Sequence, residues 1–166
     1  MIYTKIEKLL AEILNHLSTL TLSPNEFTRL TWQFDIQGSF PGLAWLSEQE
    51  FYPQFYWYHR TGSDECSALG MVKSFNGITE VERFLSNHAQ WPDMRLWGLN
   101  GWNGVADGIS EELKRASTYY FLPRLEIFRL RSNATISLYI NGEQDRLNAI
   151  EFLQKLKSPS QATLQL

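Results

Sequence analysis

The spacing of apolar residues along the 166-residue chain predicts three main helices, separated by segments of strand-like alternation. Residues 6–17 carry the clearest helical pattern, because apolar side chains recur there every three or four positions. Thr4 and Glu7 have the spacing of a capping box at the start of this helix. One face of the helix is apolar, so we expect it to dock as an ordinary surface helix on its own domain. A partner-binding or membrane helix is the alternative.

Two more helices are predicted further along the chain. Residues 79–88 combine an apolar stripe with a second capping box, formed by Thr79 and Glu82. Residues 145–157 place apolar side chains on one face and stop before a proline, which disfavours helical backbone in the preceding residue. Residues 43–49 are expected to add only a turn or two of helix.

Strand-like alternation of apolar and polar positions marks the remaining ordered stretches. They are residues 29–36, 52–75, 95–99, 119–131 and 135–140. The last two are joined by Ser132-Asn133, a pair suited to a tight turn, and are expected to form a hairpin.

The aromatic stretch at residues 52–75 is expected to form two strands joined by the polar turn 61–64. Side chains of a strand alternate between its faces, and both faces of the first strand are aromatic. This pattern predicts a strand buried on both sides near the centre of a sheet, with a hydrogen-bond partner for each buried tyrosine hydroxyl. The second strand is expected to continue to Phe75.

These elements predict an α+β fold, in which about three helices cover one face of a mainly antiparallel sheet of about six strands built from hairpins. We expect a single domain over residues 1–166, a length that can bury roughly 70% of its unfolded surface. Residues 100–117 form a long connection rich in glycine and polar side chains, and they are expected to be the least ordered part.

Composition excludes several classes of function. The chain has 15 Lys and Arg against 18 Asp and Glu, for a net charge of -3. We therefore expect no nucleic-acid partner and no attraction to an anionic membrane. No stretch approaches the roughly 20 apolar residues that cross a bilayer. Cys66 is the only cysteine, which excludes an intrachain disulfide, and a cytoplasmic location is expected.

Candidate chemistry is sparse in this sequence. The histidines lie on separate predicted elements without metal-ligand spacing: His16, His59 and His88. Cys66 and His59 flank the same turn and could form a nucleophile pair, although a buried inert thiol is the favoured interpretation. The neighbouring carboxylates Asp64 and Glu65 are expected to be solvated charges, because adjacent residues do not present both side chains to one substrate atom.

Three stretches in combination resemble a known enzyme family. They are YPQFYWYHR at residues 52–60 with ALG at 68–70, LWGLN at 96–100, and YYFLPRLEIFR at 119–129. In this order and spacing they are similar to the N-terminal region of the menaquinone-specific isochorismate synthases. Those enzymes belong to the chorismate-utilising family, together with the anthranilate and salicylate synthases.

The resemblance implies conversion of chorismate to isochorismate with magnesium, by residues in the family's C-terminal half. The Gly-Ser-Pro-Glu stretch of that half is absent from this sequence. We therefore assign no catalytic, cofactor-binding or metal-binding residue to this chain, and expect a non-catalytic part that supports the missing C-terminal chorismate-binding region. The chain alone is expected to be inactive on chorismate. Removal of its neighbour is expected to expose apolar surface and promote self-association.

Two other functions stay open. A free-standing small-ligand binding module would use a pocket between Tyr56, Tyr58 and the small residues of the following strand, and would bind an aromatic acid saturably. An interaction module would dock a separate catalytic chain through its strand edges or first helix. Residues 43–48 lack the leucine-leucine-glutamate-serine of the tryptophan-regulated anthranilate synthases, so tryptophan feedback is not expected.

Overall fold

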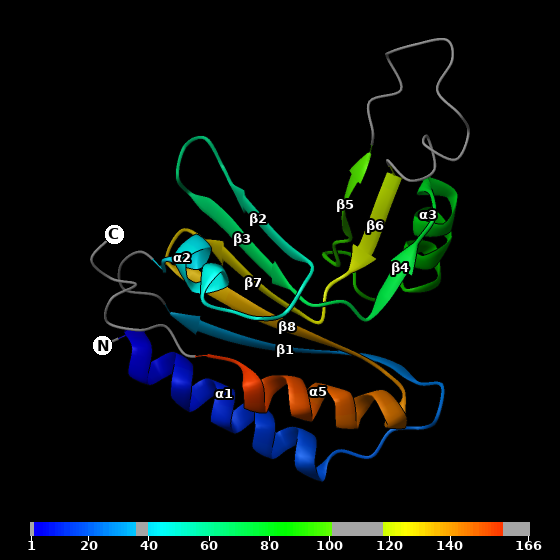
Figure 1. The fold of residues 1–166 in the computed structure, drawn as a ribbon, viewed down its shortest axis with the longest axis horizontal. Coiled ribbons are helices and arrows are strands. Elements are labelled where there is room, and N and C mark those ends of the chain that lie inside the picture. Colours follow the sequence, from blue (N-terminus) through cyan, green and yellow to red (C-terminus); the bar gives the residue numbers. More distant parts are fainter. Residues whose placement is uncertain (1, 36–39, 101–117, 158–166) are drawn as a thin grey trace. The chain divides into compact units, whose positions relative to one another are not determined.

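The computed structural model divides the chain into two compact units (Figure 1). The larger unit combines residues 1–70 with residues 124–166, and the smaller unit comprises residues 71–123. The residues described are 2–35, 40–100 and 118–157. The expectation of a single domain stays a prediction, because two compact units of one chain can still unfold as one cooperative domain.

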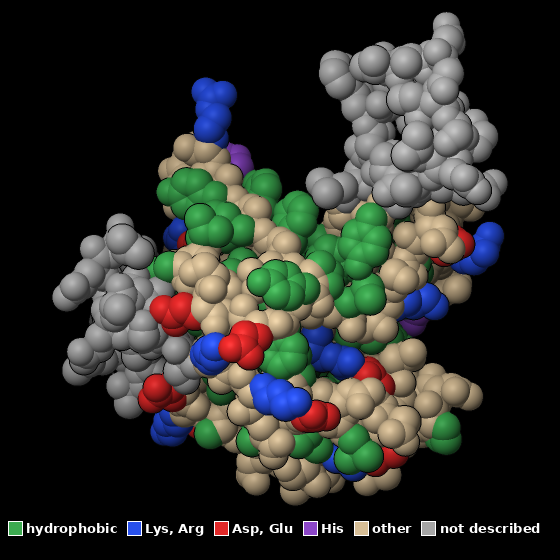
Figure 2. Space-filling view, viewed as in Figure 1, with side chains coloured by type: hydrophobic (Ala, Val, Ile, Leu, Met, Phe, Trp, Pro, Cys, Tyr) green, Lys and Arg blue, Asp and Glu red, His purple; other side chains and the backbone are tan. Residues whose placement is uncertain are grey.

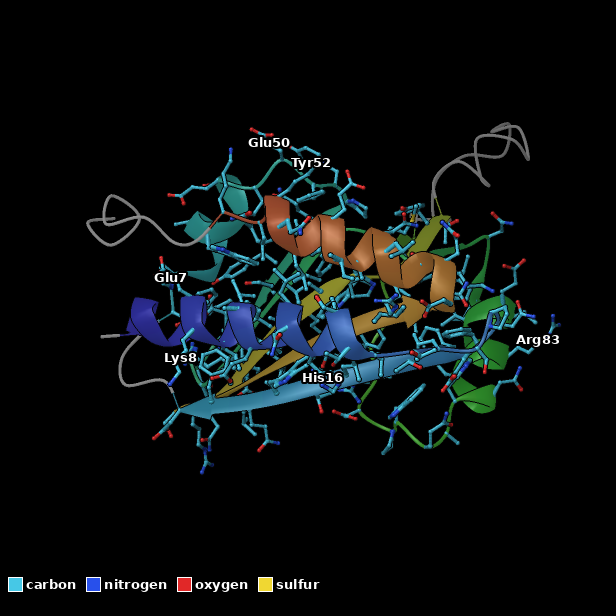
Figure 3. All side chains as sticks on the ribbon, turned by 90° about the horizontal axis from the view of Figure 1, so that it is seen from below. Glu7, Lys8, His16, Glu50, Tyr52 and Arg83 are labelled. Carbon is cyan, nitrogen blue, oxygen red and sulfur yellow. The ribbon has the colours of Figure 1, made fainter. Side chains whose placement is uncertain are left out.

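A five-stranded antiparallel sheet forms the larger unit, with the strand order β1-β8-β7-β3-β2. Its strands are β1 (Phe27–Asp35), β2 (Gln54–Tyr58), β3 (Asp64–Leu69), β7 (Leu125–Leu130) and β8 (Asn133–Asn141). Helices α1 (Ile2–Thr19) and α5 (Glu143–Lys155) lie side by side against the β1 and β8 side of this sheet (Figures 1 and 3). The short helix α2 (Gly42–Ser47) packs against β2 and β3.

The core of the larger unit lies between these helices and one face of the sheet. Along α1, the buried side chains are those at the predicted helical spacing: Ile6, Ile13 and Leu17. They meet Ile136 and Leu138 of β8 in the same apolar cluster. The expectation that the first helix docks on its own domain is confirmed. The predicted capping box at the start of this helix includes Thr4, whose side chain lies outside the described side chains.

The aromatic hairpin is confirmed, but its predicted burial is wrong. β2 stands at the edge of the sheet and pairs only with β3 among the described strands. An edge strand lacks a neighbour on one side, and α2 covers only part of one of its faces. As a result Trp57 is 38% exposed and Tyr58 is 53% exposed, while β3 in the sheet interior is buried along most of its length.

The two longest predicted strands are each broken. Gly70 has a φ of +70°, in the left-handed region that glycine tolerates best, and it ends β3 before Phe75. Pro123 separates β6 (Thr118–Leu122) from β7, because proline has no N–H to donate to a sheet. The next residue, Arg124, donates its backbone N–H to the Leu69 carbonyl at 3.1 Å, so the end of β3 lies beside the start of β7.

The smaller unit is a three-stranded antiparallel sheet of order β4-β6-β5 with one described helix. Its other elements are β4 (Lys73–Phe75), α3 (Ile78–Asn87) and β5 (Trp97–Asn100). α3 packs on β4 through the rings of Phe84 and Phe75, whose centroids are 5.1 Å apart. The predicted capping box is wrong, because Gly77 caps the helix without a side-chain hydrogen bond. Residues 101–117 of the predicted long connection lie outside the described residues.

The predicted fold class is confirmed. The described residues form helices and antiparallel strands in an α+β arrangement, with four helices and eight strands. The strands exceed the expected six because two predicted strands are divided and their parts belong to different sheets.

Candidate functional site

A pocket of about 700 Å³ opens on the larger unit beside α2 and the β2–β3 hairpin. Its lining combines apolar side chains at the mouth with a polar floor. The lining residues are Phe40, Pro41, Gly42, Leu43, Ala44, Ser47, Tyr56, Tyr58, Gly62, Glu65 and Arg129. Small-molecule sites commonly have volumes of roughly 300–1,000 Å³, so this pocket has the size of a ligand site.

Glu65 organises the polar floor of this pocket. The residue is only 5% exposed, and its carboxylate accepts three hydrogen bonds. Oε1 accepts from the Tyr56 hydroxyl at 2.9 Å and from the Gly42 backbone N–H at 3.2 Å, while Oε2 accepts from Arg129 Nε at 3.1 Å. Burial of a carboxylate is tolerable here because a cation and two further donors satisfy it. The expectation that Glu65 is a solvated charge is therefore wrong.

The same cluster changes the acidity of Tyr56. Partial burial, followed by the hydrogen bond to the negatively charged Glu65, raises the pKa of the Tyr56 hydroxyl from 10.0 to about 12. The phenol is consequently neutral at physiological pH. Its proton is directed at Glu65, and its oxygen lone pairs can accept a hydrogen bond from a ligand.

Arg129 spans the floor between Glu65 and the hairpin turn. Beside its Nε bond to Glu65, it donates from Nη1 to the Arg131 carbonyl at 3.3 Å and from Nη2 to the Gly62 carbonyl at 3.4 Å. Both terminal contacts are long for N–H···O bonds. The Arg129 side chain is 11% exposed, and it lines the pocket together with Tyr56.

The walls of the pocket depend on two glycines. A Cβ atom at Gly62 would lie 2.6 Å from the Tyr58 hydroxyl oxygen, and one at Gly42 would lie 2.6 Å from Glu65 Oε1. Gly62 also has a φ of +74°, which glycine adopts without strain. The absence of side chains at these positions lets Tyr58 and Glu65 occupy their places in the pocket.

The three histidines lie on separate elements in the structure, as they do in the sequence-based prediction. The ring of His16 on α1, labelled in Figure 3, lies edge-on to Trp32 at 6.2 Å. His59 Nδ1 lies 2.7 Å from Thr61 Oγ1 in the exposed turn, and His88 Nδ1 lies 2.8 Å from the Phe84 carbonyl. Among residues 2–35, 40–100 and 118–157, no group of three or more His, Cys, Asp or Glu side chains could hold a metal ion.

Cys66 is fully buried on β3, directly opposite Trp57, in agreement with the interpretation as a buried thiol. The sequence hypothesis placed a pocket between Tyr56, Tyr58 and the small residues of the following strand. Both tyrosines line the observed pocket, but the residue of β3 that lines it is Glu65 and not one of those small residues. Sequence reasoning missed Glu65 and Arg129, which are 64 positions apart in the chain. Only the β3–β7 pairing, which places these two residues directly opposite each other, brings them together.

Comparison with known proteins agrees with the sequence resemblance. No family model matches the chain. The chain is 32% identical over 153 residues to the isochorismate synthase MenF of Escherichia coli, and 29% identical over 127 residues to that of Pasteurella multocida. The solved structure of MenF, the menaquinone-specific isochorismate synthase from Escherichia coli, matches 92% of this chain and 34% of its own chain, with a TM-score of 0.79 and 31% identity.

The antiparallel α+β fold and these matches confirm that the chain resembles the N-terminal region of an isochorismate synthase. The particular enzyme that it matches is MenF. The aligned region is 90% of this chain and 33% of the Escherichia coli protein in the first match, and 75% of this chain and 26% of the Pasteurella multocida protein in the second. The chain thus spans about a third of the length of the curated relatives it matches.

No helix in the part of the chain that the structure describes is both long and apolar enough to cross a membrane.

Proposed function

We propose that this chain is the non-catalytic N-terminal part of an isochorismate synthase, and that it supports a catalytic region formed by the remainder of that enzyme. The observation that carries the proposal is the match of nearly the whole chain to only a third of MenF. Conversion of chorismate to isochorismate, with magnesium, would then be chemistry of the other two-thirds. A cytoplasmic location remains part of this proposal.

Two exposed apolar side chains near the β2–β3 turn support a docking role for that end of the five-stranded sheet. The middle of the same sheet face is buried, with Cys66, Glu126 and Ser137 at most 2% exposed. Trp57 and Phe128 share a face, because each pairs with Cys66, and Leu130 lies two positions beyond Phe128 on the same face of β7. The core residues Leu125 and Ile127 point to the other face. Trp57 is 38% exposed and Leu130 is 51% exposed. Figure 2 shows hydrophobic side chains at the surface around β2 and β3. Neighbouring exposed apolar side chains are typical of an interface, and we assign the end of the sheet at Trp57 and Leu130 to the missing region.

The first test is an activity assay of the purified 166-residue chain. We expect no isochorismate from chorismate with or without magnesium, because the described residues contain no cluster of metal-ligating side chains. Full-length Escherichia coli MenF, assayed under the same conditions, is the positive control. Turnover by the purified chain, at a rate above that of buffer, would contradict the proposal.

The second test concerns the supporting role. A chimera in which this chain replaces the matching third of Escherichia coli MenF is expected to be active. Trp57→Asp and Leu130→Asp in the chimera are expected to lower activity and expose the catalytic region to protease, because each buries a charge in the proposed interface. Leu147→Asp is the matched control, since Leu147 lies on α5 and is 52% exposed. Equal effects of all three substitutions would argue against docking through this sheet face.

A further inference from the structure

We propose that a second, smaller pocket binds a small doubly charged oxyanion, either inorganic phosphate or the phosphate group of a larger molecule. The pocket has a volume of about 280 Å³ and lies within the smaller unit, between β4 and α3. Its lining residues are Lys73, Phe75, Glu80, Arg83, Phe84 and Asn87. Binding here requires no step of isochorismate synthase chemistry, so the site is independent of the proposed function.

One face of α3 supplies the polar wall of this pocket. Glu80, Arg83 and Asn87 follow one another at spacings of three and four positions, which places them in one row along the helix. Phe84 stands beside that row and packs on β4, so the row is held against the strand. The row therefore brings the guanidinium of Arg83, labelled in Figure 3, and the amide of Asn87 to the pocket that β4 closes from the other side.

Lys73 supplies a second cation from β4. Its Nζ lies 5.7 Å from the centroid of the Phe75 ring and 5.6 Å from that of the Phe84 ring. Attraction between the ammonium and the two aromatic faces holds the positive charge beside the pocket. The rings do not neutralise that charge, so Nζ can still donate hydrogen bonds to an anion.

Two positive charges share this pocket with one negative charge. Within residues 2–35, 40–100 and 118–157, neither Lys73 nor Arg83 forms an ion pair. Glu80 Oε2 accepts the Asn76 backbone N–H at 3.3 Å, a contact that engages this carboxylate with the start of the helix. An anion that bridges Lys73 and Arg83 would supply the missing counter-charge, and its oxygens would accept charge-assisted hydrogen bonds from both.

Size and charge together select the ligand. Sites for drug-sized molecules commonly have volumes of roughly 300–1,000 Å³, so a pocket of about 280 Å³ suits a small ion or one terminal group of a larger molecule. A tetrahedral dianion can contact cations from two elements at once, whereas a monoanion brings only half the charge to them. We therefore expect phosphate and sulfate to bind more tightly than acetate.

The test titrates the 166-residue chain with phosphate, sulfate and acetate, and follows the backbone amide signals of Lys73, Arg83 and Asn87 by NMR. Sodium chloride keeps the ionic strength constant, because all three side chains are exposed and salt screens exposed charges. We expect saturable shifts with phosphate and sulfate at dissociation constants in the millimolar range. Acetate is expected to bind at least roughly fivefold more weakly. Methyl phosphate separates the two sources: binding comparable to that of phosphate supports a phosphate ester, and markedly weaker binding supports the free ion.

Three variants and one control locate the site. Lys73→Met and Arg83→Gln each remove one cation and should weaken phosphate binding roughly fivefold or more. Glu80→Gln removes the repelling charge, keeps an oxygen that can accept the Asn76 N–H, and should strengthen phosphate binding roughly twofold or more. Arg60→Gln is the matched control, because Arg60 is an exposed arginine outside the pocket lining, and it should leave phosphate binding unchanged.

Three results would each overturn the proposal. They are the absence of saturable phosphate binding at constant ionic strength, acetate binding as tight as that of phosphate, and equal losses in Arg60→Gln and Arg83→Gln. The last of these would mean that phosphate responds to the net charge of the chain and not to this pocket. None of these results would bear on the chimera assay.

Discussion

Breaking the ion pair between Arg124 and Asp145 is expected to be strongly destabilising for the larger unit, because it leaves a largely buried charge without its partner. Arg124 donates from Nη2 to Asp145 Oδ1 at 2.6 Å and from Nη1 to Oδ2 at 2.7 Å, and Nη1 also donates to the Tyr139 carbonyl at 2.9 Å. The two side chains are 8% and 16% exposed. The pair therefore links the residue just before β7 to the first turn of α5, close to the end of β8.

The substitution Asp145→Asn keeps the shape of the side chain and removes its charge. One Asp145 oxygen becomes an NH₂ group, which faces a guanidinium nitrogen in either orientation, because Oδ1 and Oδ2 both accept from Arg124. In place of Oδ2 it would also face the Asn141 backbone N–H, which donates to Oδ2 at 2.8 Å. The variant loses at least one charge-assisted hydrogen bond, worth about 1.5–3 kcal/mol, and leaves Arg124 largely buried without its counter-ion. Breaking a buried pair in this way costs about 3–5 kcal/mol, and the partial exposure of Asp145 places our expectation near 3 kcal/mol.

Urea denaturation at neutral pH, followed by far-UV and near-UV circular dichroism, measures this loss as a lower midpoint at an unchanged slope. Glu151→Gln is the control, because Glu151 pairs with Lys155 at 2.6 Å on the exposed face of α5, where little change is expected. A loss for Asp145→Asn below about 1 kcal/mol, or one no larger than that of the control, would refute the reasoning.

The pH dependence gives an independent check. Burial alone would raise the pKa of Asp145, but hydrogen bonds from Arg124 and the Asn141 N–H outweigh it and hold that pKa below its usual value. A carboxylate with a lowered folded pKa stabilises the fold above its unfolded pKa, and this contribution is lost as the pH falls through the folded pKa. The stability difference between wild type and Asp145→Asn should therefore shrink on acidification. A constant difference down to strongly acidic pH would contradict the assignment.

Three further predictions concern other parts of the fold. Gly70→Ala should destabilise the fold by about 1–3 kcal/mol, because φ is +70° and a Cβ would lie 3.0 Å from the nearest side chain. Gly77→Ala is the control and should cost less than about 0.5 kcal/mol, because the backbone there is extended and the space around it is open. Thermal unfolding compares the two variants. Gln49→Met should cost about 2–3 kcal/mol in urea denaturation by unpairing backbone groups of residue 157, and the exposed Gln154→Met should cost little. Stability should decline as pH rises from 10 towards 12, because the folded pKa of Tyr56 is raised to about 12, and this decline should be smaller in Tyr56→Phe; identical alkaline profiles would contradict it.

The amino-acid sequence by itself determined most of the secondary structure. The apolar repeat of the first helix, the alternation around Trp32 and the polar turn at residues 61–64 are local patterns, and each produced the element that it predicts. The motifs at residues 52–60, 96–100 and 119–129 also carried the resemblance to isochorismate synthases that the comparisons confirm. Local patterns are readable because helix and strand periodicity depend on neighbouring residues alone.

Tertiary structure decided which strand stands at the edge and which charges are buried. An aromatic strand is compatible with the centre or the edge of a sheet, and only the strand order shows that β2 lies at the edge. Glu65 looks like a solvated charge in sequence, yet pairing of β3 with β7 places it against Arg129 and closes the floor of the pocket. Such pairings depend on the packing free energy of the whole sheet, so no local pattern records them.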